Sequence, residues 1–99
     1  MKLVPKNSRI PNIGVTEFEN DPIVHLRLFH PLSNWAWYLI EYSKEENLCF
    51  GLIDGDEAEL GYFSLLELES LVIKGVRVER DLYWIPMQLS VLQKSLLQR

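Results

Sequence analysis

The stretch "SNWAWYLIEY" at residues 33–42 decides the fold of this chain, because its pattern predicts a β-strand that is apolar on both faces. A strand with one face in solvent alternates apolar and polar residues, and this one does not. The large side chains divide between two faces, Trp35, Trp37 and Leu39 on one and Ala36, Tyr38, Ile40 and Tyr42 on the other. Either the excess forms a platform for a ligand, or the stretch lies inside the fold.

The neighbouring segments predict that this stretch is the central strand of an antiparallel sheet. "PIVHLRLFH" at residues 22–30 alternates apolar and polar residues, and Pro31, Ser33 and Asn34 then supply a turn. "LCFGLID" at residues 48–54 is a short continuous apolar run, which is typical of a strand buried on both faces. A strand between these two neighbours would be paired along both edges.

The hydrophobic period then changes from that of a strand to that of a helix. "ELGYF" at residues 59–63 predicts a fourth strand. Ser64 and Glu67 form a capping box, and Lys74-Gly75 is a left-handed stop, so a helix is predicted over about 65–73.

A fifth strand is predicted over residues 76–84, "VRVERDLYW", where the alternation returns. One side of this strand would carry Val76, Val78, Arg80, Leu82 and Trp84. The other side would carry Arg77, Glu79, Asp81 and Tyr83.

The two ends of the chain are predicted to differ from this core in structure. Residues 1–21 contain prolines and a glycine without a sustained period, which favours an extended arm. The arm would lay its apolar residues against the fold, namely Ile10, Ile13, Val15 and Phe18. In the tail after Pro86, Ser90 and Gln93 form another capping box, and a short helix is predicted because three leucines repeat at helical spacing, Leu89, Leu92 and Leu96.

The predicted fold is therefore α+β, a five-stranded, mostly antiparallel meander with the 65–73 helix on one face. Residues 1–99 form one domain, in which an arm (1–21) and a tail (85–99) flank a core (22–84).

The helix is predicted to cover the Trp35 face of the opening stretch. If the arm or the tail covers the other face, the stretch is wholly core. If neither does, Tyr38 and Tyr42 are available to a partner.

Composition restricts the class of protein. The apolar fraction of 47% is that of an ordinary globular domain. No apolar run reaches the roughly 20 residues of a membrane-spanning helix, and Pro5 interrupts the start before a signal-peptide core could form. The lone Cys49 fits a reducing compartment, so we expect a cytoplasmic protein without a membrane partner.

The net charge of −4 is concentrated in the middle of the chain. Residues 41–81 hold four Lys or Arg against eleven Asp or Glu, a local charge of −7. Direct nucleic-acid binding is not expected, because that mode depends on cations that neutralise phosphates. The acidic segment is either a solubilising surface or a mimic of nucleic acid toward a basic groove, and its candidate residues are Asp54, Asp56, Glu57 and Glu59.

No pattern in the sequence predicts catalysis, a metal or a cofactor. His25 and His30 face opposite sides of one strand and cannot chelate together, and Cys49 has only apolar neighbours in sequence. The acidic turn "DGDEAE" at 54–59 lacks the glycine and the terminal glutamate of a calcium loop. The glycines are too far apart to cradle a phosphate.

One charged cluster provides the alternative of a small-molecule or enzymatic site. It would combine four ionisable residues of the fifth strand with two aromatic residues, Arg77, Glu79, Arg80 and Asp81 beside Tyr62 and Trp84. A concave pocket that joins ionisable groups to an aromatic wall would favour this alternative. A convex acidic face bordered by exposed aromatics would favour a binding protein.

Three segments, "DPIVHLRLFHPLSNWAWYLIEY", "LCFGLIDGDEAELGYFSLLELES" and "VRVERDLYW", together resemble a family of small bacterial proteins of unknown function, number 2958 in that series. The resemblance covers residues 21–84, and "ELGYFSLLELES" with "ERDLYW" is its most specific part. It implies genes that are often carried on plasmids and integrative elements, and it supplies no activity, cofactor or catalytic residue.

The function expected from these observations is that of a non-catalytic accessory factor of a mobile element, which binds a protein partner as a monomer or weak homodimer. An acidic inhibitor of a host defence or DNA-processing enzyme and the small-molecule site are the alternatives. The candidate contact residues are Tyr38, Tyr42, Asp54, Asp56, Glu57, Glu59, Arg77, Glu79 and Asp81.

Overall fold

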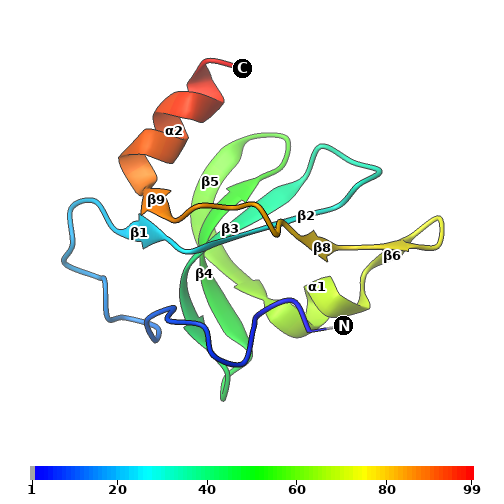
Figure 1. Cartoon of the computed structure of the whole chain (residues 1–99), viewed down its shortest axis with the longest axis horizontal. Coiled ribbons are helices and arrows are strands. Elements are labelled where there is room, and N and C mark those ends of the chain that lie inside the picture. The colour runs from blue at the N-terminus through cyan, green and yellow to red at the C-terminus, as the bar shows by residue number, and fades with distance from the viewer. Residues whose placement is uncertain (1) are drawn as a thin grey trace.

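The computed structural model describes residues 2–99 and has the predicted α+β fold, with a five-stranded antiparallel sheet and two helices (Figure 1). The sheet has the order β5-β4-β3-β2-β8, and all neighbouring strands in it are antiparallel. Its strands are β2 (Leu26–Phe29), β3 (Ala36–Ser43), β4 (Leu48–Asp54), β5 (Ala58–Ser64) and β8 (Glu79–Arg80). Two small two-stranded sheets accompany it, β1 (Ile23–Val24) with β9 (Met87–Gln88) and β6 (Val72–Ile73) with β7 (Val76–Arg77). The helices are α1 (Leu65–Ser70) and α2 (Leu89–Leu97).

The last strand of the sheet is placed on the far edge. Strands β2 to β5 follow one another as a meander, but β8 pairs with β2, with Leu28 opposite Arg80. The segment predicted as one strand over 76–84 is also divided, because β7 leaves to pair with β6 and only β8 joins the main sheet. The segment between β5 and β8 thus connects the two opposite edges of the main sheet.

Strand β3 is central, and one of its faces packs against α1 as predicted. Trp37 and Leu39 on this face are buried with Leu65 and Leu68 of the helix. Trp35 lies outside the strand, half-exposed, with its ring 6.1 Å from that of Trp37.

The first turns of α2 pack against the opposite face of β3, so residues 36–40 are buried on both faces of the strand. Tyr38 and Ile40 are buried there together with Leu89 and Leu92 of α2. Tyr38 is therefore not on a free face.

A β-bulge changes the side on which the last part of β3 points. The register with β4 shifts between Leu39 and Glu41, so that Leu39 pairs with Gly51 and Glu41 with Phe50. One extra residue reverses the alternation. Tyr42 consequently packs against the cluster of Trp37 and Leu39, which corrects its predicted place beside Tyr38.

Helix α1 begins where predicted and ends earlier. The Ser64 hydroxyl accepts the Glu67 amide at 3.2 Å, as expected of an N-cap. The helix ends at Ser70 rather than near 73, because Val72 and Ile73 turn back as β6. Lys74 and Gly75, with φ of 51° and 78°, form the two-residue turn of that hairpin instead of a helix stop.

The N-terminal arm packs against the fold as predicted at Ile10, but its most buried residues are two that were not predicted. Leu3 and Val4 are buried in the core on the α1 side, with Ile10 partly buried against it. Val15 and Phe18 are exposed instead of packed, because this part of the arm is attached by polar contacts to Glu41.

Helix α2 begins at Leu89, one residue before the serine predicted to cap it. Its N-cap, Gln88, makes no side-chain hydrogen bond. Asp21 takes that role from the other end of the chain, since its carboxylate accepts the Ser90 amide at 2.8 Å and the Ser90 hydroxyl at 2.6 Å.

Candidate functional site

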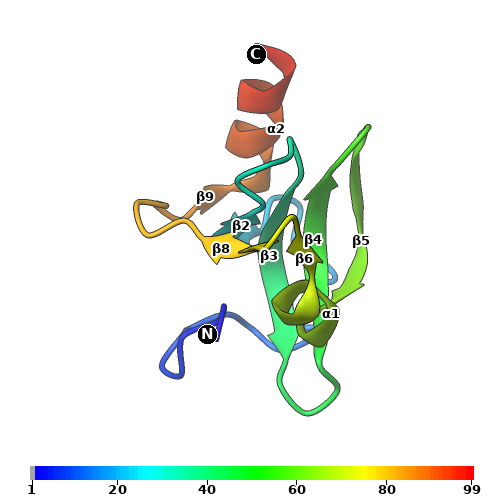
Figure 2. The same cartoon turned by 90° about the vertical axis from the view of Figure 1, so that its right-hand side faces the viewer.

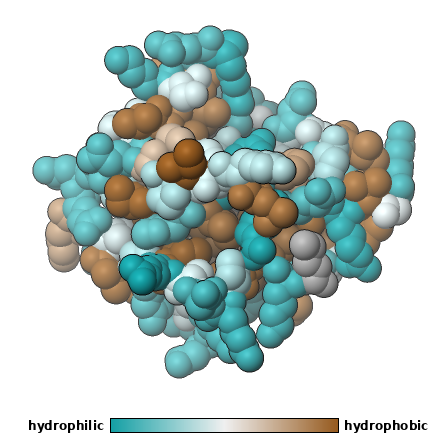
Figure 3. Space-filling model, in the orientation of Figure 1, coloured by the Kyte–Doolittle hydropathy of each residue, from teal (hydrophilic) through white to brown (hydrophobic). Residues whose placement is uncertain are grey.

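The candidate site is the connection between β8 and β9, which protrudes from the body of the protein (Figure 2). We call residues 82–85 the 82–85 loop. Three of its four side chains are large, apolar and open to solvent, with exposed fractions of 71% for Leu82, 92% for Tyr83 and 75% for Ile85. Hydrophobic side chains accordingly protrude on this side of the molecule (Figure 3).

The start of the 82–85 loop is fixed by Asp81. Its amide donates to the Arg27 carbonyl at 2.9 Å, and its carboxylate accepts the Tyr83 amide at 3.0 Å. The same carboxylate pairs with the Arg27 guanidinium at 3.3 Å. Asp81 therefore ends the pairing of β8 with β2 and forms a turn stabilised by its own side chain.

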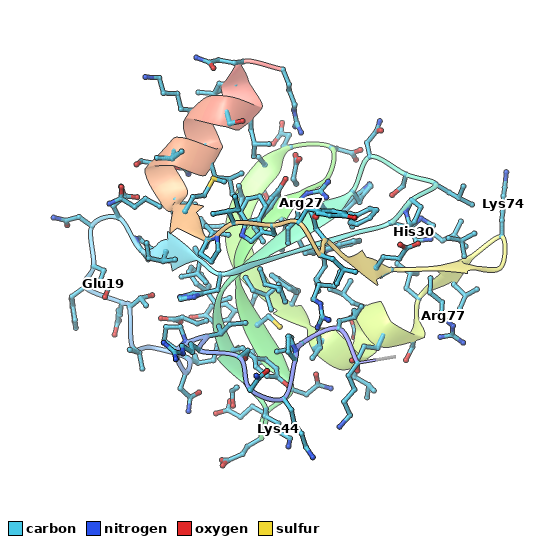
Figure 4. All side chains as sticks on the ribbon, in the orientation of Figure 1. Glu19, Arg27, His30, Lys44, Lys74 and Arg77 are labelled. Carbon is cyan, nitrogen blue, oxygen red and sulfur yellow. The ribbon has the colours of Figure 1, made fainter. Side chains whose placement is uncertain are left out.

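Arg27 is itself held by aromatic rings on the sheet (Figure 4). Its guanidinium carbon lies 4.8 Å from the ring centre of Phe29 and 5.9 Å from that of Tyr38. Its Nε donates to the Tyr38 hydroxyl at 3.3 Å. These contacts limit the movement of the cation that binds Asp81.

Trp84 fixes the middle of the loop to the core. Its indole nitrogen donates to the Val24 carbonyl at 3.2 Å, and its ring centre lies 5.4 Å from that of Tyr38. The Trp84 amide also donates to the Asp81 carbonyl. One inward-facing residue thus directs its neighbours Tyr83 and Ile85 outward on a restrained backbone.

A hollow of about 680 Å³ lies next to Arg27 and joins charged groups to aromatic walls. Its main side chains are Arg27, Phe29, Trp35, Tyr38, Asp54 and Arg99. Each charged group in it is paired within the chain, because Arg27 binds Asp81 and Arg99 contacts both oxygens of Asp54 at 2.6 and 2.8 Å. The side-chain hydrogen bonds to Asp54 and the charge of that carboxylate raise the pKa of Arg99.

His30 and Cys49 are buried, whereas His25 is only partly buried. Buried His30 bonds the Val76 carbonyl through Nε2 at 2.9 Å and accepts the Leu32 amide at Nδ1, so both ring nitrogens are used. Burial lowers the pKa of His25, against the opposing charge of Glu19. Burial raises the pKa of the Cys49 thiol to about 12, which makes it a poor nucleophile. Among residues 2–99 no three His, Cys, Asp or Glu side chains are grouped so that they could hold a metal ion.

The acidic candidates separate into a buried and an exposed part. Asp54 is buried and bound to Arg99, so it is removed from the acidic surface predicted for it. Asp56, Glu57 and Glu59 are exposed, and they line a shallow hollow beside Trp35. The exposed carboxylates therefore border an aromatic side chain.

The predicted charged cluster of the fifth strand is not assembled. Arg77 donates to the Glu69 carbonyl at 3.1 Å, and Arg80 donates to the Leu3 carbonyl at 3.3 Å. Asp81 instead binds Arg27, and Glu79 is exposed. Tyr62 lies against Phe50 on β4, while Trp84 lies against Tyr38. These residues serve different contacts and do not enclose one site.

In a comparison with known protein families, residues 5–95 match the family described as "Protein of unknown function (DUF2958)". The chain belongs to this family. We found no match among curated proteins and none among solved structures. In this DUF2958 protein no helix of residues 2–99 combines the length and the apolar character needed to cross a membrane.

The 82–85 loop of this DUF2958 protein was missed by the sequence interpretation. Alternation over residues 76–84 predicted Leu82 and Trp84 on one side of a strand, whereas Leu82 is exposed and Trp84 is packed. Asp81 was the available signal, because an aspartate that can bond the amide two residues on favours a turn over a ladder.

Proposed function

We propose that this protein is a non-catalytic protein-binding domain and that the 82–85 loop is its contact surface. The observation that carries the proposal is that Leu82, Tyr83 and Ile85 are exposed on a backbone restrained by Asp81 and Trp84. Single exposed apolar residues are ordinary, but several on one protruding loop indicate an interaction site.

The restrained backbone favours binding for a physical reason. Ordering a flexible loop at an interface costs free energy, and a loop that is already ordered avoids much of that cost. Tyrosine is also among the residues that dominate binding energy at interfaces. Tyr83, almost fully exposed and flanked by two aliphatic side chains, has the character of such an anchor.

Two further features support a binding role over catalysis. The charged groups in the hollow beside Arg27 are neutralised within the chain, and the Cys49 thiol is buried. We place the role in the cytoplasm, as an accessory factor of mobile elements, because of the family resemblance and the unpaired thiol.

A second contact surface is proposed at the acidic hairpin. Asp56, Glu57 and Glu59 around half-exposed Trp35 suit a basic face of a partner, such as the groove of a nucleic-acid-processing enzyme. The charge of this surface would increase the rate of association more than it would stabilise the complex.

The test is affinity capture from lysate of the native host, with mass spectrometry to identify the partner and calorimetry to measure its affinity. We expect Tyr83→Ala to weaken binding by about 30-fold or more, the effect of losing an interface anchor of about 2 kcal/mol. Phe18→Ala is the matched control, because Phe18 is an aromatic residue that is 93% exposed and belongs to the arm rather than to the loop.

The same assay separates the two surfaces. Neutralising Asp56, Glu57 and Glu59 to their amides should slow association and reduce its salt dependence if the acidic hairpin takes part. Binding that survives the combined changes Leu82→Ser, Tyr83→Ala and Ile85→Ser would exclude the 82–85 loop. An equal loss in the Phe18 variant would show that the effect is not specific.

A further inference from the structure

Strand β5 is an open edge of the main sheet. It pairs with β4 through seven residues on one side, from Ala58 opposite Asp54 to Ser64 opposite Leu48, with no shift of register. No other strand pairs with it among the residues that the structure describes. Figure 2 shows β5 as the outermost strand, on the side of the molecule away from the 82–85 loop.

This edge carries few of the usual features that prevent strands from pairing. Proteins protect edge strands with prolines, lysines, bulges or short length. Strand β5 reads "AELGYFS", in which Glu59 is the one charged residue and no proline or lysine occurs. The opposite edge, β8, is by contrast only two residues long and is followed by the turn at Asp81.

Apolar side chains accompany the open backbone. Leu60 is 48% exposed and Tyr62 is 60% exposed, although both are large. The Tyr62 ring lies 5.0 Å from that of Phe50 on the neighbouring strand. A strand added at this edge would therefore gain apolar contacts as well as backbone hydrogen bonds.

We propose that a second copy of this chain pairs with β5, antiparallel and with Gly61 opposite Gly61. In this register all seven residues have a counterpart, with Leu60 opposite Tyr62 of the second copy and Glu59 opposite Phe63 of the second copy. No like charges oppose each other. A register centred on Glu59 would pair only residues 58–60 and would place two carboxylates opposite each other, which is unfavourable.

The resulting dimer would be weak and would leave the proposed contact surface free. One strand pair buries far less than the roughly 1,200–2,000 Å² of stable interfaces. Because β5 and the 82–85 loop lie on different sides, the dimer presents two loops and can bind a repeated or dimeric partner more tightly than a monomer.

Sedimentation velocity over a range of concentrations tests whether the chain forms a dimer. Two variants with opposite charges on β5 test the register of the strand pair. We expect the unmodified protein to shift reversibly from monomer to dimer, half-dimeric at about 10 µM to 1 mM, as a small interface allows. The variant Leu60→Lys/Tyr62→Lys and the variant Leu60→Glu/Tyr62→Glu should each be monomeric. An equimolar mixture of the two should form a heterodimer, because residue 60 of each copy opposes residue 62 of the other.

Controls keep this result distinct from unfolding and from the role of the loop. Both variants change half-exposed side chains, and circular dichroism reports whether they remain folded. Tyr83→Ala should leave dimerisation unchanged. A protein that stays monomeric at the highest concentration, or a mixture of variants that does not associate, would overturn the proposal. If the β5 amides were protected from hydrogen exchange only after another protein is added, the strand that pairs with β5 would come from that protein, and the proposal would be overturned.

Discussion

At the scale of the residue, Gly51 permits the bulge in the central strand. A Cβ at this position would lie 1.7 Å from the Tyr38 carbonyl oxygen, far inside contact distance. Gly51 pairs with Leu39, the residue where the register with β3 begins to shift. The absence of a side chain thus lets the two backbones approach where Glu41 is turned toward the arm.

We predict that Gly51→Ala destabilises the protein by about 3 kcal/mol or more, because backbone on a central strand must move to admit the methyl group. Gly61→Ala is a matched control, since Gly61 is the partner of Gly51 on β5 and a Cβ there would meet only the Ile53 side chain at 3.5 Å. Urea denaturation measures the free energy of unfolding of both variants. Equal losses for the two variants would contradict this account.

At the scale of the element, α2 depends on a residue from the opposite end of the chain. Asp21 accepts both the amide and the hydroxyl of Ser90, in the first turn of the helix. The side-chain bond from Ser90 and then its backbone bond lower the pKa of Asp21. The helix in turn buries Leu89 and Leu92 over Tyr38.

We predict that Asp21→Ala increases hydrogen exchange in the first turn of α2 several-fold, since the Ser90 amide loses its acceptor. Gln88→Ala is the control, because the Gln88 side chain makes no capping bond. Amide exchange followed by mass spectrometry resolves the α2 peptide. No difference between the two variants would show that Asp21 does not cap the helix.

At the scale of the whole molecule, a buried carboxylate holds the middle of the arm, at Gly14 and Thr16, to the sheet. Glu41 accepts the Gly14 amide at 2.9 Å, the Thr16 amide at 2.8 Å and the Thr16 hydroxyl at 2.6 Å. Burial raises the pKa of Glu41, but the bonds from Thr16 and Gly14 outweigh it, so the pKa lies below its usual value. The contact is therefore strongest when Glu41 is ionised.

The lowered pKa fixes the sign of the pH dependence. The folded protein binds the Glu41 proton less readily than the unfolded chain, so the contribution is complete above the usual pKa of 4.5 and is lost as pH falls through the lower folded value. We predict that Glu41→Gln costs about 1–3 kcal/mol at neutral pH and less in acid.

Urea denaturation at pH 7 and at several values below 4.5 checks this prediction against Glu17→Gln, an exposed residue of the same arm. The Glu17 variant should match the unmodified protein. If the free energy of unfolding differed by the same amount between Glu41→Gln and the unmodified protein at every pH, the stability would not depend on the ionisation of Glu41.

The elements that depend on local pattern could be predicted from the sequence. Alternation over 22–30 and 33–42 predicted strands, the Ser64 capping box predicted where α1 begins, and the leucine repeat predicted α2. Period and capping are properties of neighbouring residues, so they can be read without knowing the fold. The α+β class and the central place of β3 follow from them.

The way in which these elements meet, and the residues that they expose, depend on contacts between distant parts of the chain. The bulge at Glu41, the capping of Ser90 by Asp21 and the place of β8 beside β2 each depend on residues far apart in the chain. The candidate site has the same origin, because Asp81 leaves the strand to bind Arg27 while Trp84 enters the core. Such contacts arise from the packing of the folded backbone, which hydrophobic period alone does not specify.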